Sequence, residues 1–240
     1  MSALDYVGSE LELFTDARNW KAYFSAVLAP ELRGRVLEVG AGLGSTTLAL
    51  CHPGVESWDC LEPDSTLHVK LTAMLEQKRW PCPLRARNGT LADLAANETF
   101  DTIIYIDVLE HIAEDRAELA LAASRLASGG KLVVLSPAYQ FLFSEFDAAI
   151  GHHRRYKKTS LLALTPPDLT PFTCHYLDSV GLIASLANRV VLRSSQPTRE
   201  QIRVWDRLMI PISRVLDILV RFGFGRSIIG IWIKPHLYRG

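Results

Sequence analysis

Residues 36–44 read VLEVGAGLG, and this stretch decides the fold. Its first half is apolar and suits a buried strand, and its second half turns through Gly40, Gly42 and Gly44. Residues 45–50, STTLAL, continue as a helix with hydroxyl side chains at its cap. Glycines let the backbone approach a ligand closely, and the first N–H groups of a helix are free. The stretch therefore predicts a strand–turn–helix cradle for a small molecule.

The charge at this turn separates the ligand classes. Glu38 stands two positions before the first glycine, and the glycines are spaced G-x-G-x-G. A dinucleotide site normally has the spacing G-x-G-x-x-G, and a carboxylate here repels a phosphate but suits a cation. The pattern E-x-G-x-G-x-G resembles the first motif of the class I S-adenosylmethionine (SAM) methyltransferases, whose cofactor carries an ammonium and a sulfonium.

Length and composition exclude several classes. A chain of 240 residues suits one large α/β domain. Lys and Arg total 26 and so do Asp and Glu, so we expect no nucleic-acid partner. No segment is apolar for long enough to form a transmembrane helix, and the first residues lack the pattern of a signal peptide. We therefore expect a cytoplasmic protein.

Apolar runs alternate with helical periodicity along the chain. Strands are predicted at 36–39, 57–61, 84–87, 102–106, 131–135, 172–177 and 228–233, and helices at 10–29, 67–75 and 115–127. Strands that are apolar throughout favour a parallel sheet covered on both faces. The predicted fold is α/β, a seven-stranded, mostly parallel Rossmann-like sheet with helices on both faces and an added helical segment before the last strand.

Polar groups follow the predicted strands, where ligands of such sheets bind. They are Glu38, Glu62, Asp107 and the residues 88–90, NGT. The segments 100–112, FDTIIYIDVLEHI, and 126–132, LASGGKL, are similar to the fourth motif and the fifth-strand lead-in of the class I methyltransferases. The resemblance covers most of the first 160 residues.

The resemblance implies SAM as methyl donor and S-adenosylhomocysteine as product. Glu62 would accept the ribose hydroxyls, because carboxylate oxygens suit a vicinal diol. The segment 88–91 would lie near the adenine, and Asp107 at the methionine end. Relatives often have Asp where Thr90 stands, so adenine recognition would rest on backbone groups. The implied cofactor-binding residues are Glu38, Gly40, Gly42, Gly44, Glu62, Pro63, Gly89, Thr90, Leu91 and Asp107.

Two segments offer groups for the methyl acceptor. His111 follows the fourth motif, and a histidine, with its ordinary pKa near neutral pH, suits a general base. Residues 151–156, GHHRRY, resemble a G-H-x-R-R-Y segment of a group of bacterial class I methyltransferases. We take His111, His152, Arg155 and Tyr156 as the candidate catalytic residues. A solvated basic loop is the alternative for this second segment.

The predicted function is in-line transfer of a methyl group from SAM to a small, partly apolar acceptor, without a metal. The spacing D-x-x-E-H at 107–111 also looks like the E-x-x-E-H metal motif of ubiquinone-pathway and small-RNA O-methyltransferases. One alternative is therefore a Mg²⁺-assisted O-methyltransferase using Asp107, Glu110 and His111. The other is a SAM-binding protein without turnover.

We divide a single domain, 1–240, into four parts: an N-terminal helical cap at 1–30, a SAM-binding core at 31–137, a substrate-covering insertion at 138–170 and a helical insertion at 178–226. Apolar residues recur at helical spacing in the last part, and Pro211 kinks or starts a helix there. This part also carries Arg199, Arg203, Arg207, Arg214 and Arg221. The apolar pattern of this part predicts the core of an added helical layer or a dimer face. The alternative is a lid over an apolar or lipid-like acceptor, or a peripheral membrane contact.

Overall fold

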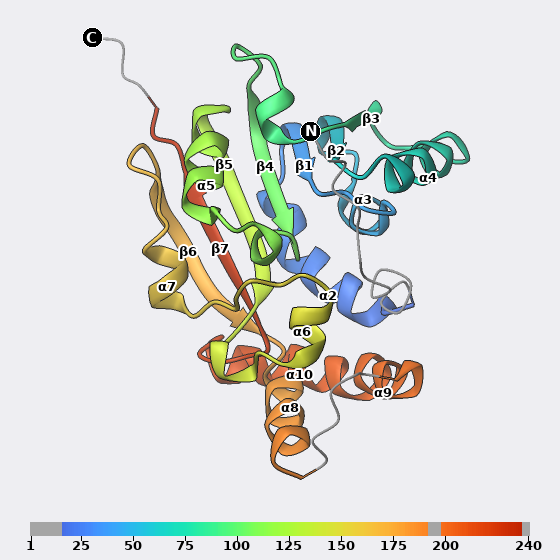
Figure 1. Ribbon diagram of the computed structural model, residues 1–240, viewed down its shortest axis with the longest axis vertical. Coiled ribbons are helices and arrows are strands. Elements are labelled where there is room, and N and C mark those ends of the chain that lie inside the picture. The colour runs from blue at the N-terminus through green and yellow to red at the C-terminus, as the bar shows by residue number, and fades with distance from the viewer. Residues whose placement is uncertain (1–15, 192–197, 237–240) are drawn as a thin grey trace.

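The computed structural model describes residues 16–191 and 198–236 and builds them around one sheet (Figure 1). Its strands are β1 Gly34–Val39, β2 Val55–Glu62, β3 Leu84–Asn88, β4 Phe100–Ile106, β5 Leu126–Pro137, β6 Thr170–Leu177 and β7 Ser227–Ile233. Their order in the sheet is β3-β2-β1-β4-β5-β7-β6. Only the pairings of β7 with β5 and β6 are antiparallel. The predicted seven-stranded, mostly parallel sheet is confirmed.

Helices cover both faces of this sheet. They are α2 Arg18–Leu28, α3 Ser45–Leu50, α4 Ser65–Glu76, α5 Asp115–Ser124, α6 Glu145–Ala149, α7 Lys158–Leu162, α8 Ser179–Val191, α9 Arg199–Val204 and α10 Ile210–Leu219. Successive strand residues point to opposite faces, so Val36 and Ile104 pack with α2, α3 and α4. Their neighbours Leu37 and Ile103 pack with α5 and α7. The core is thus two apolar layers with the sheet between them.

The helix predicted at 115–127 is too long at its C-terminal end. It ends at Ser124, because Leu126 already pairs with Phe100 as the first residue of β5. Between them, the Arg125 guanidinium donates hydrogen bonds to the carbonyls of residues 94 and 95. Of the helix predicted at 10–29, the structure forms α2 at Arg18–Leu28, and the predicted residues 10–15 lie outside the described part of the chain.

The predicted helical insertion forms an added layer at one end of the sheet. α8, α9 and α10 lie together beyond the carboxyl ends of β1 and β4, at the bottom of Figure 1. Pro211 lies in the first turn of α10, where a missing N–H breaks no helical bond, so it starts a helix as predicted. A π-helical turn, Trp205–Met209, joins α9 to α10. No helix in the described ranges is both long and apolar enough to cross a bilayer.

One buried aspartate connects this added layer to α2 and to the end of β6. Asp217 of α10 accepts hydrogen bonds from the Tyr23 hydroxyl at 2.7 Å and from the N–H groups of Asp178 and Ser179 at 2.7 and 2.9 Å. Its side chain is fully buried, so no water replaces these donors. Three segments that are far apart in the sequence therefore meet at one carboxylate.

A second aspartate in the same layer completes the helix α2. Residue 17, which precedes α2, makes no side-chain capping bond. Asp206 of the π-helical turn accepts instead from the N–H groups of Asn19 and Trp20, at 3.2 and 2.9 Å. These N–H groups belong to the first turn of a helix and have no partner within it. The added layer thus supplies the cap that the local sequence lacks.

We predict that Asp217→Ala lowers the free energy of unfolding by on the order of 3 kcal/mol, because it leaves three buried donors unsatisfied. The matched control is Tyr23→Phe, which removes one donor and should lower it by only about 1 kcal/mol. Urea denaturation of both variants measures the difference. Equal losses in the two variants would contradict the central place given to Asp217.

Candidate active site

A cavity of about 720 Å³ opens at the edge of the sheet where the parallel strands end. This volume falls in the range of roughly 300–1,000 Å³ that is usual for small-molecule sites. The predicted site residues that line it are Gly40, Gly42, Glu62, Pro63, Gly89, Thr90, Leu91, Asp107, His111, His152 and Arg155. The fold therefore brings most of the predicted cofactor and acceptor groups into one cavity.

The glycine turn leaves the start of α3 open to this cavity. Gly40 has a φ of +70°, and a Cβ there would lie 2.7 Å from Val108. Gly44, with a φ of +77°, caps α3 without a side-chain bond, so the predicted hydroxyl cap is wrong. Gly44 itself does not line the cavity, but Ser45 and Thr46 do. The first turn of α3, with its free N–H groups, thus lies beside the cavity.

Glu38 does not line the cavity, contrary to the prediction. Its carboxylate is buried and accepts hydrogen bonds from the Thr47 hydroxyl at 2.6 Å and the Trp58 indole N–H at 2.8 Å. Burial raises the pKa of Glu38 to about 7, and these two bonds oppose the rise. The residue joins the end of β1 to α3 and β2. Through these bonds it positions the glycine turn from behind the cavity wall.

Glu62 lines the cavity at the end of β2, as predicted. One carboxylate oxygen accepts from the Gly42 N–H at 2.7 Å and the other from the Asp64 N–H at 3.0 Å. Burial raises the pKa of Glu62, and these two N–H groups oppose the rise. Each oxygen has a second lone pair for a hydroxyl donor. Glu62 thus both shapes the glycine turn and presents an acceptor pair.

The segment after β3 forms the next part of the wall. The hydroxyl and the N–H of Thr90 both donate to Asp93, at 2.8 and 2.7 Å. Both donors of Thr90 are therefore used within the protein, and the residue serves the cavity wall mainly by its shape. Leu91, which is fully buried, adds an apolar surface beside it. This wall suits a flat, apolar ring face.

Asp107 stands where β4 ends, in a left-handed backbone conformation with a φ of +53°. The Asp107 side chain is exposed to the cavity, although protein atoms surround the carboxylate beyond its nearest contacts. This enclosure raises the pKa of Asp107 to about 6, and the positive charges of His152, Arg226 and Arg155 oppose the rise. Near neutral pH the cavity therefore holds a carboxylate that suits a cationic group.

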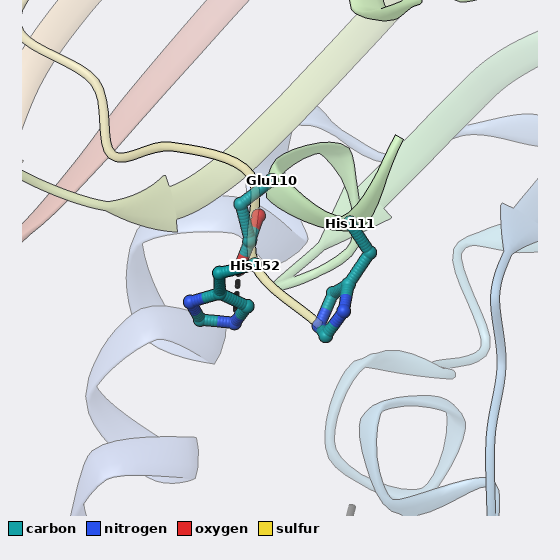
Figure 2. Close-up of side chains that lie close together, drawn as sticks. All are labelled: Glu110, His111 and His152. Atoms are coloured by element: carbon teal, nitrogen blue, oxygen red, sulfur yellow. Dashed lines mark ion pairs between the residues drawn. The ribbon is translucent and has the colours of Figure 1, made fainter. Parts of the chain in front are cut away.

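Three side chains, Glu110, His111 and His152, lie close together at this end of the sheet, as Figure 2 shows. The rings of His111 and His152 meet edge to face, with centroids 4.5 Å apart. Glu110 is fully buried, and one of its oxygens accepts from the Ser136 hydroxyl at 2.9 Å. The other oxygen has no hydrogen-bond partner and lies 3.8 Å from Nε2 of His152. Burial, with the neighbouring histidines, lowers the pKa of His111 to about 4, so its ring is neutral.

Asp147 of α6 holds the two predicted residues of the following loop. Its carboxylate lies 2.9 Å from Nδ1 of His152 and accepts two hydrogen bonds from the Arg155 guanidinium. Burial alone would raise the pKa of Asp147, but His152, Arg155 and Ser144 hold it well below its usual range. His152 and Arg155 are therefore fixed at the cavity wall by an ionised carboxylate.

Tyr156 does not face the cavity, although the sequence predicts it. It is buried, and its hydroxyl donates to Asp115 at 2.9 Å. Its N–H donates to the carbonyl of Pro137 at 3.0 Å. Extended backbone alternates its side chains, so the residue next to Arg155 points into the protein. Tyr156 anchors the loop that carries His152 and Arg155.

Several wall residues lie outside the predicted set. Trp20, Phe24 and Trp205 form an apolar part of the wall, and the sequence pattern assigned them to helix cores. Arg226, just before β7, also lines the cavity, and its guanidinium lies 5.3 Å from the ring centroid of Trp205. Burial lowers the pKa of Arg226. No motif marks this arginine, because only the path of the chain brings it to the site.

The chain matches known proteins in family and in fold. The family described as "Methyltransferase domain" matches residues 11–176. No curated protein sequence matches. Among solved structures, the methyltransferase in complex with the Trm112 methyltransferase activator from Haloferax volcanii has a TM-score of 0.62 at 16% identity, covering 96% of each chain. A SAM-dependent methyltransferase from Clostridium acetobutylicum has a TM-score of 0.56 at 12% identity, covering 92% of each. A phosphoethanolamine N-methyltransferase from Haemonchus contortus, in complex with phosphomonomethylethanolamine and S-adenosylhomocysteine, has a TM-score of 0.63 at 10% identity, covering 98% of this chain and 61% of the other.

The chain therefore belongs to the methyltransferase domain family. It is a class I SAM-dependent methyltransferase, with SAM as methyl donor and S-adenosylhomocysteine as product. The cavity fits this cofactor, because a glycine turn without side chains lies beside acceptor oxygens of Glu62 and the negative charge of Asp107. These groups match a vicinal diol and a cationic amino-acid end.

We predict that SAM affinity falls as the pH drops through about 6, because protonation of Asp107 removes a charge that attracts the ammonium. From pH ~7.5 to ~5 the dissociation constant should rise by up to about tenfold. Calorimetric titration over this range measures it. Asp107→Asn should bind more weakly near neutral pH and show a flatter pH dependence, and an unchanged pH profile in this variant would exclude Asp107 as the titrating group.

Proposed function

We propose that this methyltransferase acts on a small, partly apolar acceptor whose proton is taken by His111. The observation that carries the proposal is the position of a neutral imidazole beside the strand-end groups of the same cavity. Phe146, Ile150 and Trp205 give the acceptor side an apolar wall. The balanced charge of the chain supports a small molecule over nucleic acid.

Each wall of the cavity has its own task in this proposal. Glu62 and Asp107 hold and orient the cofactor by its ribose and its amino-acid end. Bound SAM supplies a methyl group on a sulfonium, which transfers in line to a nucleophile. His111 accepts the proton of the acceptor at an imidazole nitrogen, and its lowered pKa keeps that nitrogen unprotonated near neutral pH. His152 and Arg155, held by Asp147, orient the acceptor.

Transfer of tritium-labelled methyl groups from SAM into fractionated small-molecule and lipid extracts tests the proposal. We expect a labelled product with the native enzyme. For His111→Gln we expect kcat to fall by about 100-fold or more, since a positioned base contributes at least this factor. Its SAM affinity, measured by calorimetry, should not change. His153→Gln replaces an exposed neighbour and should leave kcat near the native value. Tight SAM binding without any labelled product would favour the binding protein without turnover.

The geometry also supports a second candidate, a metal-assisted methyl transfer. Ligand atoms of Glu110, His111 and His152 all lie within 4.8 Å of one another (Figure 2). The unpartnered, buried oxygen of Glu110 points to a ligand in this place. His152 replaces Asp107 in the ligand set expected from the sequence. Two imidazoles and one carboxylate suit Zn²⁺, Mn²⁺ or Fe²⁺ better than Mg²⁺.

The two candidates predict different responses to chelation. In the metal-assisted case, dialysis against a chelator abolishes methyl transfer, and Zn²⁺ or Mn²⁺ restores it more effectively than Mg²⁺. His152→Ala should then lose bound metal by elemental analysis, while His153→Ala retains it. Full activity after chelation, with no metal in the purified protein, would leave His111 as the base.

A further inference from the structure

The outer side of the added helical layer carries an apolar stripe. Val204, Leu208, Ile212, Val215 and Leu219 follow one another at intervals of three or four residues, so they share one helix face. Their exposed fractions run from 47% to 73%. Eight of the twelve exposed large apolar side chains in the described ranges lie in residues 183–219, on α8, α9, α10 and the π-helical turn. The other four are scattered, so this stripe is a specific feature of the layer.

Arginines form the edge of this stripe. Arg203, Arg207 and Arg214 each directly precede an exposed apolar residue, about 100° away around the helix. Arg199 and Arg221 extend the row at its two ends, and both are exposed. Residues 199–221 include three acidic residues. Asp206 and Asp217 are buried and accept hydrogen bonds, so Glu200 is the exposed negative charge in this range. A chain with no net charge thus presents a strongly positive, apolar strip on one side.

Three of these arginines also share a cleft. Arg199, Arg203 and Arg207 line it together with Arg18 of α2, and its volume is about 310 Å³. Asp16 and Asp206 lie in the same wall, and Asp206 already caps α2. Guanidinium groups bind phosphates through paired, charge-assisted hydrogen bonds. The cleft therefore has the chemistry of a phosphate site beside the apolar stripe.

We propose that α9, the π-helical turn and α10 bind the surface of an anionic lipid bilayer. A helix with an apolar stripe and a basic edge lies in the interface, with the stripe among the acyl chains and the arginines at the headgroups. The run carries too many charged residues to span the bilayer, in agreement with the absence of a membrane-crossing helix in the described ranges. The occupant of this face is the phosphate-rich surface of the membrane.

The charge pattern disfavours a second copy of the chain as the occupant. A twofold contact uses the same patch on both copies, so it would gather the exposed arginines of two chains at one interface. Like charges brought together in this way oppose association. An anionic bilayer, in contrast, complements both the stripe and its edge.

The proposed surface also lies next to the acceptor side of the cavity, and this step rests on the proposed function. Trp205 faces the cavity from the inner side of the same helical run. The outer face is therefore only about one helix diameter, ~10 Å, from the cavity wall. Membrane binding would bring the acceptor pocket to a source of amphiphilic acceptors.

Sedimentation of the full chain with sucrose-loaded vesicles tests the proposal. The probes are vesicles of phosphatidylcholine alone and vesicles that also contain phosphatidylglycerol. We expect binding to the anionic vesicles only. Leu208→Ser with Val215→Ser should weaken it at least about tenfold, and Arg203→Gln with Arg207→Gln on the order of 25-fold. The matched controls, Val69→Ser and Lys78→Gln with Arg79→Gln, change exposed residues of α4 and the segment after it, outside the proposed surface, and should bind normally.

Calorimetric SAM binding by every variant separates this test from that of the proposed function, since the substitutions leave the cavity intact. Failure of the native chain to sediment with anionic vesicles would overturn the proposal. Equal sedimentation of the stripe and control variants would do so as well. A native dimer in light scattering that Leu208→Ser with Val215→Ser converts to a monomer would assign the face to a second copy instead.

Discussion

Buried carboxylates that need hydrogen-bond donors organise this molecule. A carboxylate is stable away from water only where donors surround it, and here the donors come from distant segments. Asp217 and Asp206 draw theirs from α2, nearly two hundred residues away in the sequence. Glu38 and Glu62 draw theirs from the helix and the turn that follow β1. Each carboxylate therefore joins elements that apolar packing alone would leave free to slide. Together they hold the added helical layer, the first helix and the glycine turn around one cavity.

The same constraint shapes the electrostatics of the site. Asp107 faces the cavity, and the protein around it raises the pKa of its carboxyl to about 6. A cation bound there would stabilise the ionised carboxylate, so the site suits a positively charged ligand. His111, a few residues on, is kept neutral by burial and by its histidine neighbours. A cation bound in the same cavity would lower the pKa of His111 further and keep its ring neutral.

Much of the fold could be predicted from the sequence because its signals are local. Apolar strands, the glycine turn and the polar residues at strand ends depend on neighbours within a few positions, and the strand-end groups Glu62 and Asp107 lie where predicted. Errors arose where a distant contact decided the outcome. The carboxylate of Glu38 is bonded to Thr47 and Trp58 and does not line the cavity. Tyr156 is turned inward toward Asp115. Arg226 reaches the cavity only because β7 inserts between β5 and β6.

The acceptor side differs from the cofactor side in how it is built. Cofactor groups stand on the ends of parallel strands, whose positions the sheet itself fixes. Acceptor groups stand on the loop after α6, on the π-helical turn and before β7, segments that the sheet does not constrain. Such segments vary among proteins of one fold, and function resides in them more than in the fold. Structural neighbours with identities of 10–16% therefore show the fold alone. The acceptor has to be inferred from what these segments carry, which is His152 and Arg155 fixed by Asp147, together with an apolar wall.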